Sequence, residues 1–399
     1  MRPVKVLLLM VLSGFTMFRS FAQTWMPTIA PSNLWNCVAL SADGSKLVAV
    51  SESGPDSLGS IYTSPDGGTT WVSNNVVNTN WSSCASSADG TMLVAVANGG
   101  AIYTSTNSGA IWTQSTNAPA LYWNCVASSA DGTKLAAVDG PGGLWPMYLS
   151  TNSGATWTNA KVASEQAWNP VTLSADGTRL ASGTQLGTGP INFSTNSGAS
   201  WFTNGSPANN SWRTFASSAD GTTLICAAGY TMADGVYFST DAGATWGHTN
   251  VPGPNSVAAS ADGKTLLIGV TPGLGSGGPI YISTNSGATW AKTDAPITNS
   301  WQSVACSADG NKLVAVARGG GIWTAQMTPS PQINFSPPNG NVALSWFVPS
   351  TNFILQSSPD LFTWMAVTNQ VALNLTDLQD EVSLPVSASN SFFRLSTSP

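Results

Sequence analysis

The sequence predicts an all-β protein: a seven-bladed β-propeller of four-stranded blades, closed by the N-terminal strand and followed by a small β-sandwich-like domain. Two interleaved repeats indicate this fold. An eight-residue box, STNSGATW, occurs at Ser150–Trp157 and again at Ser283–Trp290, and the tetrapeptide S-A-D-G recurs ahead of apolar runs. Both return every 41 to 47 residues. Short strands between glycine-rich turns at this period are typical of propeller blades.

The box has six copies, and its third position predicts a structural role. The other copies are SPDGGTTW (Ser64–Trp71), STNSGAIW (Ser105–Trp112), STNSGASW (Ser194–Trp201) and STDAGATW (Ser239–Trp246). The third position holds Asp66, Asn107, Asn152, Asn196, Asp241 and Asn285. Asn forms the same side-chain-to-backbone turn as Asp but cannot serve as a carboxylate base or nucleophile. We expect the fifth-position Gly to adopt a positive φ and the Trp to cover the turn.

The pattern S-x-D-x-G-x-x-W resembles the Asp-box, or BNR, repeat from Gln23 to about Met327. Families with this box include the sialidase-like superfamily, some endoglucanases acting on xyloglucan, sortilin-type receptors and photosystem II assembly-factor propellers. The resemblance implies a propeller and leaves the function open. It also implies that the boxes lie on the face away from the ligand.

One repeat shows the expected blade. Trp81–Ser87 and Met92–Ala97 are predicted strands around the turn at Asp89-Gly90, Ala101–Ser105 is a third strand, and a fourth begins at Ile111. A tryptophan stands eight residues before six of the seven Asp-Gly turns: Trp35, Trp81, Trp123, Trp168, Trp212 and Trp301. These indoles either pack between blades or form a ring that stacks on sugars.

The last repeat lacks a box, which predicts how the ring closes. After a third strand at Gly321–Thr324, the chain continues with Ala325-Gln326-Met327 where the box should stand. The N-terminal segment Thr24–Thr28 resembles the fourth strand that follows the other boxes. We therefore expect it to complete the last blade, because propellers leave only short, protected edges.

The two ends of the chain differ from the repeats. Residues 1–22 resemble a signal peptide, with Arg2 and Lys5 before the apolar Val6–Phe18 and a cleavage site after Ala22. This predicts a secreted or periplasmic, cell-envelope location without membrane insertion after cleavage. Beyond the propeller (23–327), residues 328–332 read as a stiff linker. Residues 333–399 predict five or six strands of the β-sandwich-like domain.

Charge and composition exclude several function classes. Without Arg2, Lys5 and Arg19 the chain keeps 13 − 3 = 10 basic residues against 19 acidic ones, which disfavours nucleic acid as a partner. We expect no cofactor and no metal, since Cys/His clusters and phosphate-binding glycine loops are lacking. The five cysteines recur inside predicted strands, which favours buried thiols over disulfides.

Candidate site residues lie where the repeats differ. The loops between second and third strands are short at Asn98–Gly100 and Arg318–Gly320 and longer in the other repeats. Exposed loop aromatics commonly contact sugars or protein partners, so the candidate ligand-binding residues are Trp145, Tyr230 and Arg318. The candidate catalytic carboxylates, which no spacing supports, are Glu52, Asp139, Glu165 and Asp234.

The sequence therefore favours a secreted, non-catalytic binding propeller that recognises an extracellular glycan or protein ligand through the variable-loop face. A sialidase is disfavoured, because the propeller has only Arg179, Arg213 and Arg318 to clamp a carboxylate. One alternative is an extracellular polysaccharide-degrading glycoside hydrolase that uses a carboxylate pair. Another is an envelope assembly or scaffold factor.

Overall fold

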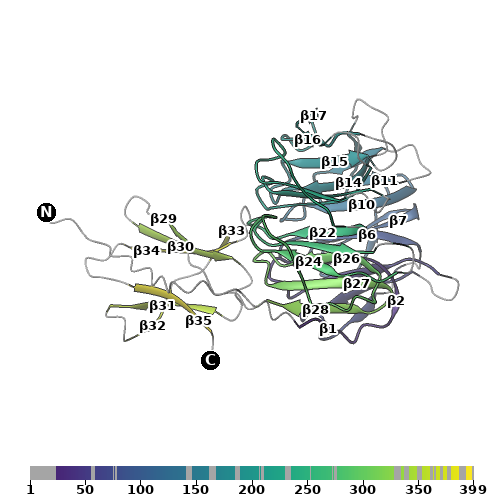
Figure 1. Cartoon of the computed structure of the whole chain (residues 1–399). Helices are drawn as coiled ribbons and strands as arrows, with labels where there is room; N and C mark the ends of the chain where they lie inside the picture. Colours follow the sequence, from purple (N-terminus) through teal and green to yellow (C-terminus); the bar gives the residue numbers. More distant parts are fainter. Residues whose placement is uncertain are drawn as a thin grey trace.

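The computed structural model describes residues 24–327 apart from 55–58, 75, 77–78, 141–145, 161–167, 185–188, 206, 208–210, 230–234, 252, 272 and 274–275. After residue 327 it describes 334–336, 341–347, 353–359, 363, 365–368, 372–374, 379–385 and 392–397. These residues form antiparallel sheets and contain no helix (Figure 1). None of their segments is therefore a helix that could cross a membrane.

Up to residue 327 the strands pair in antiparallel series that follow the sequence repeats, and we call each series a blade. The first blade is β2 (Asn33–Leu40), β3 (Leu47–Ser51), β4 (Ile61–Ser64) and β5 (Val72–Asn74). The second is β6 (Trp81–Ser86), β7 (Leu93–Gly100), β8 (Ile102–Ser105) and β9 (Thr113–Gln114). The third is β10 (Leu121–Ser128), β11 (Leu135–Asp139), β12 (Met147–Ser150) and β13 (Thr158–Asn159).

The later repeats continue the same order. The next blade is β14 (Trp168–Leu173), β15 (Leu180–Thr184), β16 (Asn192–Ser194) and β17 (Phe202–Thr203). It is followed by β18 (Trp212–Ser217), β19 (Leu224–Ala228), β20 (Val236–Ser239) and β21 (Gly247–Thr249), and then by β22 (Pro254–Ala259), β23 (Leu266–Val270), β24 (Ile280–Ser283) and β25 (Ala291–Lys292). The last blade is β26 (Trp301–Cys306), β27 (Lys312–Gly320), β28 (Ile322–Gln326) and, from the N-terminus, β1 (Met26–Pro27).

Burial along each blade explains its sequence. Second strands such as β3 and β23 are buried at every residue, because each packs against the neighbouring blades on both faces. Third strands such as β4 bury their first and last residues. Outer strands such as β9 are exposed and only two or three residues long. A short exposed outer strand gives another chain little edge to pair with.

A circle of backbone hydrogen bonds joins the blades. The alanine of each S-A-D-G turn donates its N–H to the carbonyl oxygen of the corresponding alanine in the next blade, at 2.7–2.9 Å. The circle runs through Ala42, Ala88, Ala130, Ala175, Ala219, Ala261 and Ala308 and returns from Ala308 to Ala42. First strands of successive blades also contact one another, and β26 contacts β2. The series of blades therefore closes into a ring.

The recurring tryptophans pack between blades. Trp35, Trp81, Trp123, Trp168, Trp212 and Trp301 are at most 2% exposed. Most meet an aromatic ring of the third strand of their own blade, as Trp81 meets Tyr103 at 5.3 Å in a T-shaped contact. Such buried aromatic pairs stabilise a core beyond their area alone. These tryptophans therefore pack between blades and do not form an exposed ring that could stack on sugars.

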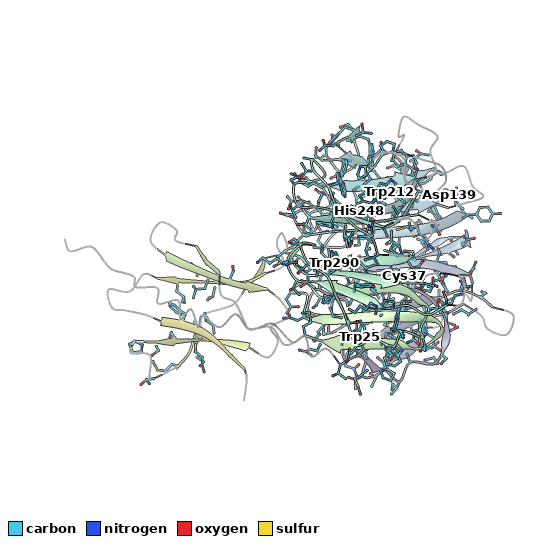
Figure 2. The ribbon with its side chains drawn as sticks, in the orientation of Figure 1. Trp25, Cys37, Asp139, Trp212, His248 and Trp290 are labelled. Carbon is cyan, nitrogen blue, oxygen red and sulfur yellow. The ribbon has the colours of Figure 1, made fainter. Side chains whose placement is uncertain are left out.

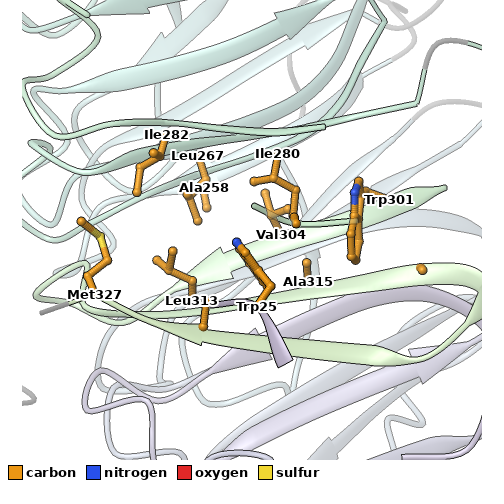
Figure 3. Packing of buried hydrophobic residues seen from close by; sticks show 13 residues of the cluster. Trp25, Ala258, Leu267, Ile280, Ile282, Trp301, Val304, Leu313, Ala315 and Met327 are labelled. Atoms are coloured by element: carbon orange, nitrogen blue, oxygen red, sulfur yellow. The ribbon is translucent and has the colours of Figure 1, made fainter. Parts of the chain in front are cut away.

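The N-terminal strand pairs where the sequence placed it. Met26 lies opposite Thr324 and Pro27 opposite Trp323, so β1 is the outer neighbour of β28. The adjacent Trp25 is 4% exposed and lies 6.2 Å from Trp301 between ring centroids. Figure 3 shows the Trp25 indole among Leu313, Ala315 and Val304, side chains of one buried cluster.

The box turns use Asp and Asn in the same way. In the first box, Thr70 N–H donates to Asp66 Oδ1 at 2.7 Å. In the third box, Thr156 N–H donates to Asn152 Oδ1 at 2.8 Å, and Asn152 Nδ2 donates to the Thr156 hydroxyl. The fifth-position glycines have positive φ, such as 81° at Gly154. The fourth position also lies in the left-handed region, which the sequence pattern did not predict.

Burial changes the pKa of the aspartate differently in two of the Asp-Gly turns, those of Asp131 and Asp309. At Asp131, burial opposes ionisation, but hydrogen bonds from Ser129 and Thr133 outweigh it and lower the pKa. At the equivalent Asp309, burial dominates over the bonds from Ser307 and Asn311 and raises the pKa to about 6. The last blade therefore holds a carboxyl group that stays protonated at mildly acidic pH, where the equivalent Asp131 is ionised.

This contrast predicts opposite pH effects for two equivalent substitutions. Because the folded pKa of Asp309 exceeds the unfolded value of about 3.9, its stabilising contribution is complete below that value and is lost as the pH rises through about 6. Asp309→Asn should therefore raise the melting temperature at pH 8 more than at pH 4.5. Asp131→Asn, the control, should lower it at pH 8. If both variants changed the melting temperature equally at both pH values, this prediction would be wrong.

The strands after residue 333 form two sheets. One has the order β29 (Asn334–Ser336), β30 (Asn341–Phe347), β34 (Gln379–Pro385) and β33 (Ala372–Asn374). The other is β32 (Met365–Ala366), β31 (Phe353–Ser358) and β35 (Phe392–Thr397). Leu344, Val382 and Leu355, from both sheets, share one buried cluster. The described strands outnumber the five or six expected.

Candidate functional site

A polar cavity of about 360 Å³ lies at the N-terminal ends of the first strands. Its walls come from all the blades: Asn36, Cys37, Glu52, Asn80, Ser82, Ser83, Asn98, Asn124, Cys125, Pro170, Arg213, Thr214, Asn255, Ser256, Gln302 and Ser303. The circle of alanines is at the opposite ends of these strands, where it lines a smaller cavity of about 170 Å³. The polar cavity is therefore one mouth of the central channel, on the face away from the boxes.

The position directly after the recurring tryptophan, or after Pro254 in the repeat that lacks this tryptophan, supplies much of this wall. It holds Asn36, Ser82, Asn124, Arg213, Asn255 and Gln302 among the lining residues. These residues were not among those predicted from the sequence. A signal is present in the sequence, because this position is polar in every repeat although it follows a buried residue, a tryptophan in six repeats and Pro254 in the other. A carboxamide both donates and accepts hydrogen bonds, so these side chains suit a ligand that does the same.

Hydrogen bonds between blades orient the cavity side chains. Asn36 Nδ2 donates to the carbonyl oxygen of Trp81 at 2.9 Å, and Asn255 Nδ2 donates to that of Trp301 at 2.9 Å. The Ser82 hydroxyl donates to the Trp123 carbonyl oxygen at 2.6 Å. The wall is thus held by the same contacts that join the ring, and preorganised polar groups bind with a smaller entropic loss.

Two predicted site residues meet at this mouth. Glu52 lines the cavity and forms an ion pair with Arg318, which is half-exposed on β27. The main chain brings them together, because Leu34 pairs with Arg318 while its carbonyl oxygen accepts the N–H of Glu52 at 3.0 Å. The pair therefore spans the contact between the last blade and the first. Arg318 holds the Glu52 carboxylate at the cavity rim.

The remaining candidates are placed differently. Asp139, at the end of β11, is fully buried and accepts the N–H of Gly140 at 3.1 Å (Figure 2). Among the described residues, Glu52 is the carboxylate of the cavity wall, and Asp139 does not join it there. Trp145, Glu165, Tyr230 and Asp234 lie outside the described residues. The single histidine, His248, is on the outer strand β21, 4.5 Å from the Tyr237 ring.

Two cysteines face the cavity in a ring of hydroxyl and thiol groups. Ser83, Ser256 and Ser303 each accept the N–H of a valine in the next blade, as from Val304 to Ser256 Oγ at 3.0 Å. Cys37 and Cys125 hold the equivalent position. Hydrogen bonding with the side chain and main chain of Cys84 outweighs burial and lowers the pKa of Cys37 to about 7. The described residues contain no group of three or more side chains suited to hold a metal ion.

Comparisons with known proteins bear on the fold alone. No protein-family model matches the chain, and no curated protein matches it. Among solved structures, YCF48 bound to D1 peptide is 13% identical with a TM-score of 0.56, over 77% of this chain and 97% of that one. YCF48 from Cyanidioschyzon merolae is 14% identical with a TM-score of 0.56, over 76% and 98%. Hydrazine synthase from Kuenenia stuttgartiensis is 16% identical with a TM-score of 0.58, over 76% and 97%.

These solved structures are β-propellers that agree with the chain over most of its ring. At such low identities the similarity concerns the fold and not the activity. Taken with the closed circle of blades, it establishes that this chain has a β-propeller fold.

Proposed function

We propose that this chain is an exported, non-catalytic binding protein whose propeller recognises an extracellular protein or glycan ligand at the polar mouth of its channel. In this proposal residues 1–22 are a signal peptide, 23–327 form a seven-bladed Asp-box propeller and 333–399 form a separate β-sandwich-like domain. The observation that carries the proposal is the cavity wall, where carboxamides from successive blades surround one space.

The chemistry of the wall favours an extended protein segment over a stacked sugar. Main-chain amides of a peptide donate and accept hydrogen bonds in alternation, which carboxamides such as Asn124 and Gln302 can match. The lining residues that are described contain no aromatic ring on which a sugar could stack. YCF48, a structural neighbour, is known bound to a peptide. Glycan binding would instead use Trp145 and Tyr230, so the two ligand classes call for different residues.

Binding measurements with two sets of variants test the proposal. Peptide and glycan arrays identify a ligand, and its Kd is then measured for Asn124→Ala and Gln302→Ala. Loss of a cavity hydrogen bond should weaken binding about tenfold, equivalent to about 1.4 kcal/mol. Thr113→Ala, on the exposed outer strand β9, is the matched control and should bind normally. Normal binding by both cavity variants would contradict the choice of site.

The same preparation tests catalysis and assembly. A reducing-sugar assay on extracellular polysaccharides should detect no turnover. Turnover that disappears in Glu52→Gln would instead establish a glycoside hydrolase, because Glu52 is the described carboxylate of the cavity wall. Stable co-purification with envelope proteins in the absence of array binding would favour an assembly or scaffold role.

A further inference from the structure

Two cysteines from neighbouring blades lie against each other beside the channel. The sulfur of Cys37, on β2, is 3.4 Å from the carbonyl oxygen of Cys84, on β6. The Cys84 thiol also hydrogen-bonds the Cys37 sulfur. Cys84 is 4% exposed and its sulfur is 3.7 Å from the Val48 carbonyl oxygen, in the space between the two blades. Both thiols are free in this structure.

The contact arises because the two cysteines stand at different offsets in their repeats. Cys37 is two residues after Trp35, and Cys84 is three residues after Trp81. Between blades, the side chain at the first offset meets the main chain at the second, as Ser83 meets Val126 at 3.2 Å. Cys125 has the first offset too, but it meets Val171. The pair is not evident from equivalent positions of the repeat, since the contact joins positions that are not equivalent.

We propose that Cys37 and Cys84 form a disulfide that joins the first two blades when the exported protein meets a disulfide-bearing oxidant. The Cys37 sulfur already lies against the main chain of Cys84, 3.4 Å from its carbonyl oxygen, and a disulfide requires the two sulfurs to approach to about 2.0 Å. Cys37 also lines the polar cavity, so a small oxidant reaches it from the channel mouth. Extracellular and periplasmic compartments supply such oxidants.

The reaction proceeds by two exchange steps. The Cys37 thiolate attacks an oxidised small disulfide, forms a mixed disulfide and releases one small thiolate, which takes up the proton that Cys37 lost. Cys84 then gives up its proton and attacks the Cys37 sulfur, which releases the second small thiol. Two protein thiols are oxidised and one small disulfide is reduced to two thiols. The hydrogen bonds that lower the pKa of Cys37 suit it to the first step, while burial keeps the pKa of Cys84 high.

Thiol counting on the full chain tests the proposal. Reduced protein is incubated with oxidised glutathione, alkylated and weighed after denaturation. We expect wild type to lose two of its five thiols without gaining glutathione, and its melting temperature to rise because the cross-link restricts the unfolded chain. In the Cys125→Ser variant, a tryptic digest of the oxidised protein should contain the peptide ending at Lys46 joined by a disulfide to the peptide of residues 47–134. In this variant Cys84 is the only cysteine of the second peptide.

The repeats themselves supply conservative variants. Cys37→Ser introduces the residue found at this position as Ser83, and Cys84→Val introduces the residue found as Val126. Cys84→Val should keep one glutathione bound to Cys37 and form no disulfide. Cys37→Ser should bind no glutathione and form no disulfide. A folded wild type that keeps all five thiols, a stable glutathione adduct without a link, or a link to another cysteine would each overturn the proposal.

Discussion

Replacing Trp25 with glycine should destabilise the whole ring by roughly 3–5 kcal/mol, the range measured when a buried tryptophan or phenylalanine is truncated. The indole is 4% exposed and packs against Trp301 inside a cluster drawn from the last two blades. Its loss leaves a cavity in that cluster. Glycine also increases the conformational freedom of the unfolded chain next to the strand that closes the last blade. Because the blades are joined in a circle, we expect one cooperative transition at lower urea concentration.

Met26→Ala is the matched control for this prediction. Met26 is the next residue on the same edge, but its side chain is 59% exposed, so truncation should change stability by less than about 0.5 kcal/mol. Urea unfolding followed by near-ultraviolet circular dichroism and by limited proteolysis distinguishes the outcomes. If Trp25→Gly only freed the N-terminal segment to proteolysis and left the transition midpoint unchanged, the N-terminal strand would be dispensable for closure.

The strands were predictable from the sequence because their pattern repeats. The predicted Trp81–Ser87 and Ala101–Ser105 correspond closely to β6 and β8. The fourth strand was less accurate, since it was expected from Ile111 and begins at Thr113. The box explains the difference: the N–H of Ile111 donates to Asn107 Oδ1 at 2.8 Å, so Ile111 still belongs to the turn. A periodic pattern locates a strand, but it does not show at which residue a turn closed by a side-chain hydrogen bond ends and the strand begins.

The cavity wall was harder to predict because its geometry departs from regular strand alternation. In most first strands the register shifts just after the tryptophan, as between Trp35 and Cys37. Such a bulge places an extra residue opposite one partner and redirects the neighbouring side chains. Asn36 and Cys37 consequently both line the cavity, although alternation would send them to opposite faces. The sequence carries no clear marker for this bulge.

The ion pair at the rim was beyond the sequence for another reason. Glu52 and Arg318 were each selected because they are unrepeated loop residues, and nothing in their spacing joins them. Their contact depends on closure of the ring, which brings β27 beside β2. A long-range pairing of this kind is set by the number of blades and the register of the last one. The residues around Glu52 and Arg318 give no sign of that register.

Introducing valine at Gly183 should destabilise the protein by about 3 kcal/mol, although valine is the usual residue there. Equivalent positions in other second strands hold Val50, Val96, Val138 and Val316. A Cβ at Gly183 would lie 2.6 Å from Trp212 and 2.8 Å from Phe215 of the next blade, closer than side-chain atoms can approach. Overpacking of a buried site costs roughly 1–3 kcal/mol.

Phe215 is the one of the two crowding side chains that differs from its equivalents in other repeats, so a second substitution there should rescue the first. Phe215 stands where other first strands hold valines such as Val126 and Val304, and its larger ring fills the space that Gly183 leaves. Phe215→Val alone should leave a cavity and also destabilise the protein. The double variant restores the pairing of valine with valine, and Trp212 can then pack as Trp81 does beside Val50.

A double-mutant cycle measures this compensation. We expect the double variant to be more stable than Gly183→Val and the coupling energy between the two sites to reach about 1–3 kcal/mol, as for residues in direct contact. Gly269 provides the control, because a Cβ there would be 3.0 Å from Val304, a smaller neighbour than Phe215. Gly269→Val with Phe215→Val should be additive, since the two positions lie in different blade contacts. Additivity at Gly183 and Phe215 as well would mean that the glycine is required by the main chain and not by its neighbour's size.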